Sequence, residues 1–260
     1  MKAAFFDIDG TIWDRDNFIP PSAIEGIRRF REKGNYAFIC TGRARAYVTN
    51  PDLWAVGFDG AVCGCGTHVE LNGKMIYEKL LGPELSRHTL ETVRRHGFRP
   101  IFEGPKHLYM DYHEFDSHDD FGNKIRRDME GELLSIAGNE DCIVANKLSC
   151  ATDNVKTAAC FKELSEYYDF IVHNPEVVEM VPKGHTKATG IAKVCEYFGM
   201  DISDTIAFGD GENDVDMLKF AGNSVAMGNG SESAKAAATL VTDSLYDDGI
   251  YKALLKLGVI

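Results

Sequence analysis

At 260 residues the chain is long enough for one large domain or two smaller ones, and its 44% hydrophobic and 26% charged residues are ordinary for a globular protein. A formal net charge of −12 argues against a general nucleic-acid-binding protein, because such proteins need basic surfaces. An anionic substrate would need a local positive site set against the overall field.

The N-terminus and the cysteines favour a cytoplasmic location. The first residues turn acidic too quickly for a signal peptide, and no apolar run is long enough to span a membrane. Seven cysteines, an odd number without the spacing of a secreted framework, indicate reduced thiols. Cys63 and Cys65 form a C-x-C pair, but no second Cys or His pair stands at the spacing of a structural zinc site.

The first predicted element is a buried strand over residues 3–6, which runs directly into Asp7, Asp9, Gly10 and Thr11. Apolar residues at both parities are typical of a strand covered on both faces, as in a parallel sheet. Alternation sends Asp7 and Asp9 to the same side, where two carboxylates repel each other unless a cation or a shared proton compensates. In open α/β sheets, ligands bind beyond this end of the strands. A plain turn is the alternative, since Asp and Gly are common turn residues.

Helices and strands alternate in the rest of the first third. The capping-box spacing of Ser22 and Glu25 predicts a helix that stops near Gly34. The opening strand, this helix and the next strand form a βαβ unit with a parallel pair. The further predicted elements are strands 36–40 and 58–62, and a hairpin of 69–71 and 75–77 around Asn72 and Gly73.

Over residues 82–181 hairpins replace crossovers, which predicts an α+β region. The stretch from His113 to Asp120 holds residues that can ligate metals, but a solvated turn or helix start is the favoured reading, because nothing fixes a ligand geometry. The predicted elements here are helices at 83–96 and near 154–168, and strands at 98–102, 108–112, 142–148, 170–173 and 177–181.

Crossovers return at Pro182. The predicted helices are 186–198, 216–220, 233–238 and 250–257, and the predicted strands are 205–208, 224–227 and 240–242. The expected fold is therefore α/β: a Rossmann-like, mostly parallel sheet core made of residues 1–81 and 182–260, with residues 82–181 inserted as an α+β domain.

Four polar loops, at residues 7–11, 41–43, 183–187 and 209–214, can meet at one edge of such a sheet. Together they offer one hydroxyl, one lysine, one amide and the carboxylates of Asp7, Asp9, Asp210 and Asp214. Hard oxygen ligands in that number suit Mg²⁺. A lysine and a metal in one site suit a phosphoryl group.

These loops make the chain resemble the haloacid dehalogenase-like superfamily, in particular the Cof-type phosphatases. The resemblance covers the whole chain, and it implies that residues 82–181 form an α/β cap that selects the substrate. One departure is the Cys65-Gly66-Thr67 sequence, where the subgroup usually carries Asn-Gly-Ala. The matching motifs, in order, are FDIDGT at 6–11, CTGR at 40–43, PKGHTK at 182–187 and GDGEND at 209–214, followed by VAMGN at 225–229 and DGI at 248–250.

The resemblance implies a role for each acidic residue. Asp7 is the expected nucleophile, which forms an aspartyl-phosphate; with an ordinary pKa of about 3.9 it needs no base. Asp9 is the expected acid/base, which protonates the leaving oxygen and then takes a proton from water. The Mg²⁺ site would use the Asp7 carboxylate, the Asp9 backbone carbonyl and Asp210, with Asp214 supporting it from the edge.

Four further residues are expected to bind the phosphate: Thr41, the Gly42 backbone, Lys187 and Asn213. Taken singly, Lys187 could instead be a surface helix residue and Thr41 a helix cap; the presence of all four motifs in order favours the binding roles.

The expected activity is hydrolysis of small phosphorylated metabolites, sugar phosphates first, by a Mg²⁺-dependent monomer or homodimer that binds neither membrane nor nucleic acid. A phosphomutase with the same cap and aspartates is the nearest alternative. A catalytically silent phosphometabolite sensor is the second, and the intact catalytic residues argue against it. Arg43 and Arg45 could either contact substrate or be solvated, and the sequence does not identify the substrate.

Overall fold

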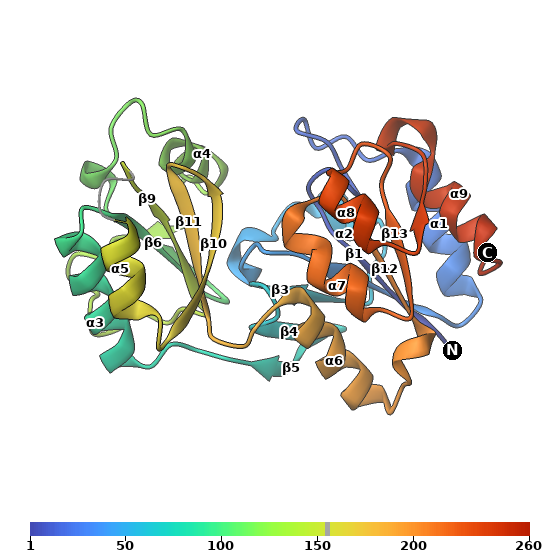
Figure 1. The fold of residues 1–260 in the computed structure, drawn as a ribbon, viewed down its shortest axis with the longest axis horizontal. Coiled ribbons are helices and arrows are strands. Elements are labelled where there is room, and N and C mark those ends of the chain that lie inside the picture. The colour runs from blue at the N-terminus through green and yellow to red at the C-terminus, as the bar shows by residue number, and fades with distance from the viewer. Residues whose placement is uncertain (154–156) are drawn as a thin grey trace. The chain divides into compact units, whose positions relative to one another are not determined.

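The opening apolar run is a central strand of an eight-stranded sheet in the computed structural model, which describes residues 1–153 and 157–260 (Figure 1). The strands of this sheet are β1 Ala3–Phe6, β2 Tyr36–Cys40, β3 Gly60–Cys63, β4 His68–Leu71, β5 Lys74–Glu78, β12 Thr205–Gly209, β13 Asn223–Ala226 and β14 Leu240–Val241. Their order is β14-β13-β12-β1-β2-β3-β4-β5. Neighbours from β14 to β3 are parallel, and β4 is antiparallel to β3. The predicted mostly parallel α/β core is therefore confirmed.

Helices cover both faces of this sheet. α6, α7 and α8 pack on the face that carries Phe5 and Phe38, while α1 lies along α9. The helices are α1 Pro21–Glu32, α2 Pro51–Ala55, α6 Lys187–Phe198, α7 Val215–Phe220, α8 Glu232–Ala237 and α9 Gly249–Lys256, with one-turn 3₁₀ helices η3 Ile202–Asp204, η4 Glu212–Asp214 and η5 Leu245–Asp247.

The direction of strand order reverses at β1. The chain leaves β1 toward β2 and β3 on one side, and β12, β13 and β14 extend the sheet on the other. Ligands of open α/β sheets bind at such a switch point, beyond the carboxyl ends of the strands. The residues that follow β1 and β12 therefore stand where a site is expected.

The second sheet has six strands in the order β10-β11-β9-β6-β7-β8 and is mainly antiparallel. α3 and α5 pack on the face that carries Phe102 and Leu148, and α4 packs on the face that carries Ile101. The elements are β6 Arg99–Glu103, β7 Leu108–Tyr109, β8 Leu133–Leu134, β9 Lys147–Ala151, β10 Tyr168–Asn174, β11 Val177–Pro182, α3 Pro83–Arg95, α4 Asp120–Asp128 and α5 Thr157–Leu164, with 3₁₀ helices η1 Arg45–Tyr47 and η2 Tyr112–Glu114.

The chain divides into two units, one around each sheet. The first comprises residues 1–42, 50–77 and 186–260, and the second comprises residues 43–49 and 78–185. Residues 43–49, which the sequence reading assigned to the core, group with the second unit because Ala46 packs against Ile101 and Leu108 and its N–H donates to Gly104 O at 3.3 Å.

Several local predictions were wrong or incomplete. The strand expected over 108–112 ends at Tyr109, as β7, and residues 112–114 form the 3₁₀ helix η2 instead. Ser22 does not cap α1: the N-cap is Pro20, and no side-chain cap is formed. The predicted strand at 142–148 starts later, as β9 at Lys147, because the preceding residues bond outside the sheet: the Cys142 N–H donates to Asn139 O in a turn, and Ala145 O accepts from the Leu81 N–H, both at 2.8 Å. The helix expected from residue 154 is described only from Thr157; the predicted start lies outside the described residues.

Candidate active site

Loops after three adjacent strands bring the predicted site residues to one sheet edge. Asp7 follows β1, Thr41 follows β2 and Asp210 follows β12, and these three strands are neighbours. The Asp7 N–H donates to Phe208 O at 2.9 Å, which continues the β1–β12 ladder by one bond. The position of Asp7 is therefore fixed by the sheet itself.

Lys187 enters the same edge from the start of α6. Thr186 caps this helix and accepts from the Thr189 N–H, so Lys187 is the first helical residue. Its Nζ lies 2.6 Å from Asp7 Oδ1 and 2.5 Å from Asp214 Oδ1. Lys187 is only 1% exposed, which rules out the alternative of a solvated surface lysine.

Both carboxylate oxygens of Asp214 accept hydrogen bonds. Oδ1 accepts from Lys187, and Oδ2 accepts from the backbone N–H groups of Asp210 at 2.9 Å and Gly211 at 2.8 Å. The side chain is completely buried. With three donors on one carboxylate, Asp214 links Lys187 to the loop of Asp210 and holds both in place.

The Asp210 carboxylate accepts a hydrogen bond from a hydroxyl and packs closely against a glycine. Its Oδ1 accepts from Thr11 Oγ1 at 2.8 Å. Gly10 has φ +87°, and a Cβ at that position would lie 2.3 Å from Asp210 Oδ2. Only glycine lets the two loops approach this closely without displacing the carboxylate.

Burial and mutual repulsion shift the carboxyl groups in the same direction. Burial, and then the charge of Asp214, raise the pKa of Asp7 well above its usual range, although Lys187 opposes this, so the expectation of an ordinary pKa for Asp7 is wrong for the metal-free protein. Burial also raises the pKa of Asp210 to about 6. For Lys187, burial acts to lower the pKa, but Asp214 and Asp7 outweigh it and hold the pKa well above its ordinary value.

The carboxylates fit a divalent cation. Oxygen atoms of Asp7, Asp210 and Asp214 all lie within 4.8 Å of one another. Three carboxylates against the one ammonium of Lys187 leave two negative charges, which a hard divalent ion would balance. Since Asp214 already accepts from three donors, Asp7 and Asp210 are better suited to bind the ion directly.

Asp9 stands apart from this group. The strand ends at Phe6, so its alternation does not govern position 9, and the exposed Asp9 carboxylate is outside the cluster of Asp7, Asp210 and Asp214. It borders a cleft of about 540 Å³ that Asp210 also lines. The charge of Asp9 nevertheless acts to raise the pKa of both Asp7 and Asp210, so Asp9 lies beside the cluster, and the expectation that Asp7 and Asp9 point to the same side stays a prediction.

The structure places the predicted phosphate-binding residues on the neighbouring loops. Thr41 is 1% exposed at the end of β2, where its N–H donates to Val62 O at 2.8 Å and its carbonyl accepts from the Cys65 N–H at 3.2 Å. Gly42 follows it, also buried. Asn213 lies in η4, between Glu212 and the bracing Asp214.

Cys65 occupies the position where the resemblance expects Asn. Its φ of +53° is in the left-handed region, which Asn tolerates better than Cys. Its N–H still bonds Thr41 O. The backbone contact to the second motif therefore does not need the Asn side chain.

The sequence reading missed the supporting role of Asn229. Its Nδ2 donates to Gly10 O at 2.8 Å, and its Oδ1 accepts from the Leu245 N–H at 2.9 Å. It thus ties the first motif to the C-terminal segment. Its place in the VAMGN match was the signal that could have found it.

Arg43 and Arg45 lie in the segment that groups with the second unit. The Arg43 guanidinium stacks 4.7 Å from the centre of the Tyr47 ring, and Arg45 Nη1 donates to Val48 O at 3.1 Å. Both contacts stay within residues 43–49.

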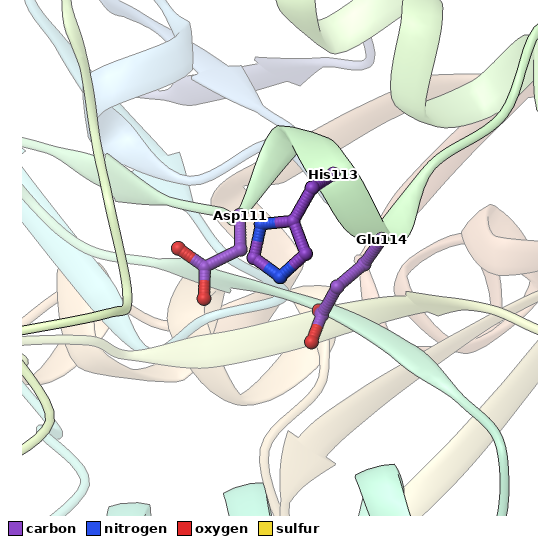
Figure 2. Close-up of side chains that lie close together, drawn as sticks. All are labelled: Asp111, His113 and Glu114. Atoms are coloured by element: carbon purple, nitrogen blue, oxygen red, sulfur yellow. The ribbon is translucent and has the colours of Figure 1, made fainter.

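A second group of metal-type side chains, Asp111, His113 and Glu114, lies close together in the second unit (Figure 2). A cation is already there: Arg94 lies 2.7 Å from Asp111 Oδ2 and 2.7 Å from Glu114 Oε1. The Asp116–His118 stretch is exposed and leads to α4, which Asp119 caps. The solvated helix start is therefore the correct description of that stretch.

Among the described residues, no helix combines the length and apolar character needed to cross a membrane. Residues 4–254 match the family of haloacid dehalogenase-like hydrolases. The chain is 31% identical to YkrA of Bacillus subtilis strain 168, provisionally named a phosphatase, over 100% of this chain and 98% of that protein.

Two further relatives carry more detailed names. YitU of Bacillus subtilis strain 168, named a 5-amino-6-(5-phospho-D-ribitylamino)uracil phosphatase, is 26% identical over 95% of this chain and 94% of its own. A solved structure described as the HAD subclass IIB sugar phosphatase BT4131 is 26% identical, covers 100% of both chains and superposes with a TM-score of 0.84. The motif order, the fold and these matches agree: the chain belongs to the haloacid dehalogenase-like hydrolase family, as a Cof-type member and a phosphoric monoester hydrolase.

Proposed function

We propose that this protein is a Mg²⁺-dependent phosphatase that hydrolyses small phosphorylated metabolites through an aspartyl-phosphate intermediate. Sugar phosphates are the leading class of proposed substrate. The observation that carries the proposal is the buried ion pair of Asp7 and Lys187, 2.6 Å apart, beside Asp210. A carboxylate held at a sheet edge next to a lysine and a third acidic group suits nucleophilic attack on a phosphate.

Asp7 is the proposed nucleophile. Its carboxylate oxygen bonds to phosphorus while the bond from phosphorus to the leaving oxygen breaks. Approach of two anions is the main barrier, and Lys187, fixed by Asp214, offsets it by placing a positive charge where the phosphate oxygens arrive.

Asp9 is the proposed acid/base. Its carboxylate is exposed and borders the same cleft as Asp210, so a substrate can reach it. In the first step it gives a proton to the leaving oxygen. In the second step it takes a proton from the water that attacks phosphorus and frees Asp7.

Mg²⁺ bound at this site would neutralise the excess negative charge and polarise the phosphoryl group. The Asp7 and Asp210 carboxylates and the Asp9 carbonyl are the proposed ligands, and Asp214 supports them through the backbone of the Asp210 loop. Thr41, the Gly42 N–H and Asn213 are the proposed donors to the phosphate oxygens, from the loops that adjoin Asp7.

The proposed substrates are phosphate monoesters of polyhydroxylated carbon chains. A sugar phosphate and a phosphoribityl group, the substrates in the names of two relatives, share that chemistry. Residues 82–181 are proposed to act as the cap that selects among them, because the binding energy from remote substrate groups must come from residues outside the loops that hold the phosphate. We further propose a cytoplasmic monomer or homodimer that binds no nucleic acid.

A panel of phosphorylated metabolites, with 4-nitrophenyl phosphate as a generic substrate, tests the proposal. Phosphate release should require Mg²⁺, and undiminished turnover in excess EDTA would contradict it. Adding a hexose phosphate with a bisphosphate activator separates the phosphomutase alternative: transfer of phosphate between positions without release would favour the mutase.

A further inference from the structure

The loop that carries Asp9 folds back so that an indole lies against the Asp9 carboxylate. Ile8 O accepts from the N–H groups of Ile12 and Trp13 at 3.0 and 3.1 Å, and the Gly10 N–H donates to Trp13 O at 2.9 Å. This turn brings Trp13 Nε1–H to 3.1 Å from Asp9 Oδ1. The two side chains are held together by the geometry of one tight turn.

The two partners differ in burial and in chemistry. Trp13 is 3% exposed, so its ring is fixed by packing, while Asp9 is exposed toward the cleft. The indole N–H can donate a hydrogen bond and cannot accept one. Whatever the protonation state of Asp9, its Oδ1 must therefore serve as the acceptor in this bond.

We propose that Trp13 is a positioning residue for Asp9, and this rests on the acid/base role given to Asp9 in the proposed function. By holding Oδ1 as the acceptor, the indole assigns the transferable proton to Oδ2. It also fixes the direction in which that oxygen points, because a hydrogen bond from a packed ring limits rotation of the carboxyl group.

The assignment accounts for both steps of the reaction. In the first, the proton on Oδ2 passes to the leaving oxygen as the Asp7–phosphorus bond forms and the ester bond breaks. In the second, water bonds to phosphorus, its proton moves to Oδ2 and the Asp7–phosphorus bond breaks. One oxygen in one position serves both transfers, which keeps donor and acceptor within reach throughout.

The test is Trp13→Phe, which keeps a buried ring and removes the donor. A hydrogen bond to a charged group predicts a loss of about 10- to 100-fold in kcat/KM for ribose 5-phosphate, whose alkoxide needs the proton. For 4-nitrophenyl phosphate, whose leaving group needs little protonation, the loss should stay within about threefold. An equal loss on both substrates would overturn the proposal.

Two controls separate positioning from structure. Ile12→Val removes buried volume from the same turn and should lower Tm without moving the ratio of the two kcat/KM values. In an Asp9→Asn background, Trp13→Phe should change that ratio no further. If Asp9→Asn itself leaves the ratio unchanged, the acid/base role fails; if Asp9→Asn lowers it and Trp13→Phe does not, only the Trp13 proposal fails.

Should Trp13→Phe not fold, the hydrogen bond is observable directly. The chain has two tryptophans, so Trp54→Phe leaves Trp13 as the single indole. Its N–H resonance in a ¹⁵N NMR spectrum should move when Asp9 is replaced by Ala in that background. An unmoved resonance would overturn the proposal, because the indole would then have no bond to Asp9.

Discussion

Each of the two units buries a lysine between two carboxylates. In the second unit it is Lys147 on β9, whose Nζ lies 3.2 Å from Glu103 Oε1 and 3.0 Å from Glu179 Oε2. Lys147 and Lys187 are each 1% exposed. A charge at that depth has lost its hydration, so each lysine depends on its carboxylates.

The carboxylates respond in opposite directions. Burial acts to raise the pKa of Glu179, but Lys147 and a hydrogen bond with His173 outweigh it and bring the pKa to about 2. In the first unit, burial and neighbouring carboxylates raise the pKa of Asp7 well above its usual range.

The cause is the ratio of carboxylates to cations. Three carboxylates surround Lys187, whereas two face Lys147, and one of these two, Glu179, also bonds the His173 imidazole. The larger excess of negative charge destabilises the first arrangement and makes it suited to a divalent cation, while the second has one carboxylate fewer for its lysine. We therefore propose that the same buried motif serves a reaction in the first unit and structure in the second.

The largest difference in turnover between the two units should appear when one carboxylate in each unit is changed to an amide. Asp7→Asn removes the nucleophile, so turnover should fall to background, roughly 10⁴-fold or more, with no phosphoenzyme formed. Glu103→Gln, the matched change beside Lys147, should keep turnover of 4-nitrophenyl phosphate within about threefold. Rapid-quench kinetics measure both. A covalent burst from Asp7→Asn, or loss of activity in Glu103→Gln, would break the comparison.

Removing each lysine should separate activity from stability. Lys187→Met and Lys147→Met both leave buried carboxylates without their cation, which typically costs about 3–5 kcal/mol of stability. Only Lys187→Met should also lose turnover of 4-nitrophenyl phosphate, by about 10³-fold or more. Thermal scans and initial rates below the lowest Tm check this. Equal activity losses at equal folded fraction would mean that the two lysines have the same role.

The loops of the candidate site could be predicted because each one immediately follows a strand or begins a helix. Asp7, Thr41 and Asp210 follow parallel strands, whose carboxyl ends lie at one edge of a sheet, so the common edge could be expected before the strand order was known. Trp13 could not be found this way: its role depends on a turn that brings positions 9 and 13 together, and no motif marks it.

The charged group of the second unit depends on strand register, which local pattern does not fix. Ile143 and Ala145 are buried and looked like strand residues, yet β9 starts only at Lys147. With that start, Lys147 and Ser149 share one face of β9. The contact with Glu179 then needs the β9–β11 pairing, between segments that are far apart in the chain.

Acid should act on the second arrangement through Glu179. Its folded pKa is lowered, so its contribution is present above the unfolded value of about 4.3 and is lost as the pH falls through about 2. Glu179→Gln should therefore destabilise the second unit by about 2–3 kcal/mol at pH 7, and this deficit should shrink between pH 4.5 and about pH 2. Hydrogen exchange of the β9 and β11 amides measures the stability of the second unit separately from that of the first. A deficit that does not change with pH would contradict the pairing.

The smallest expected effect has the opposite sign. Asp210→Asn removes one of the three carboxylates around Lys187, and the amide oxygen can still accept from Thr11 Oγ1. Since burial raises the pKa of Asp210 to about 6, its ionised form is unfavourable in the folded metal-free protein at neutral pH. We expect the variant to gain about 1 kcal/mol of stability without metal.

Tryptophan fluorescence measures this gain, because Trp13 and Trp54 both belong to the first unit. The wild type should gain Tm as Mg²⁺ is added, since an ion that binds only the folded state stabilises it by mass action. Asp210→Asn should lose most of that gain, while Asp16→Asn, an exposed carboxylate on the same cleft, should keep it. A metal-free Asp210→Asn protein that unfolds more easily than the wild type would show that excess negative charge is not what distinguishes the first unit from the second.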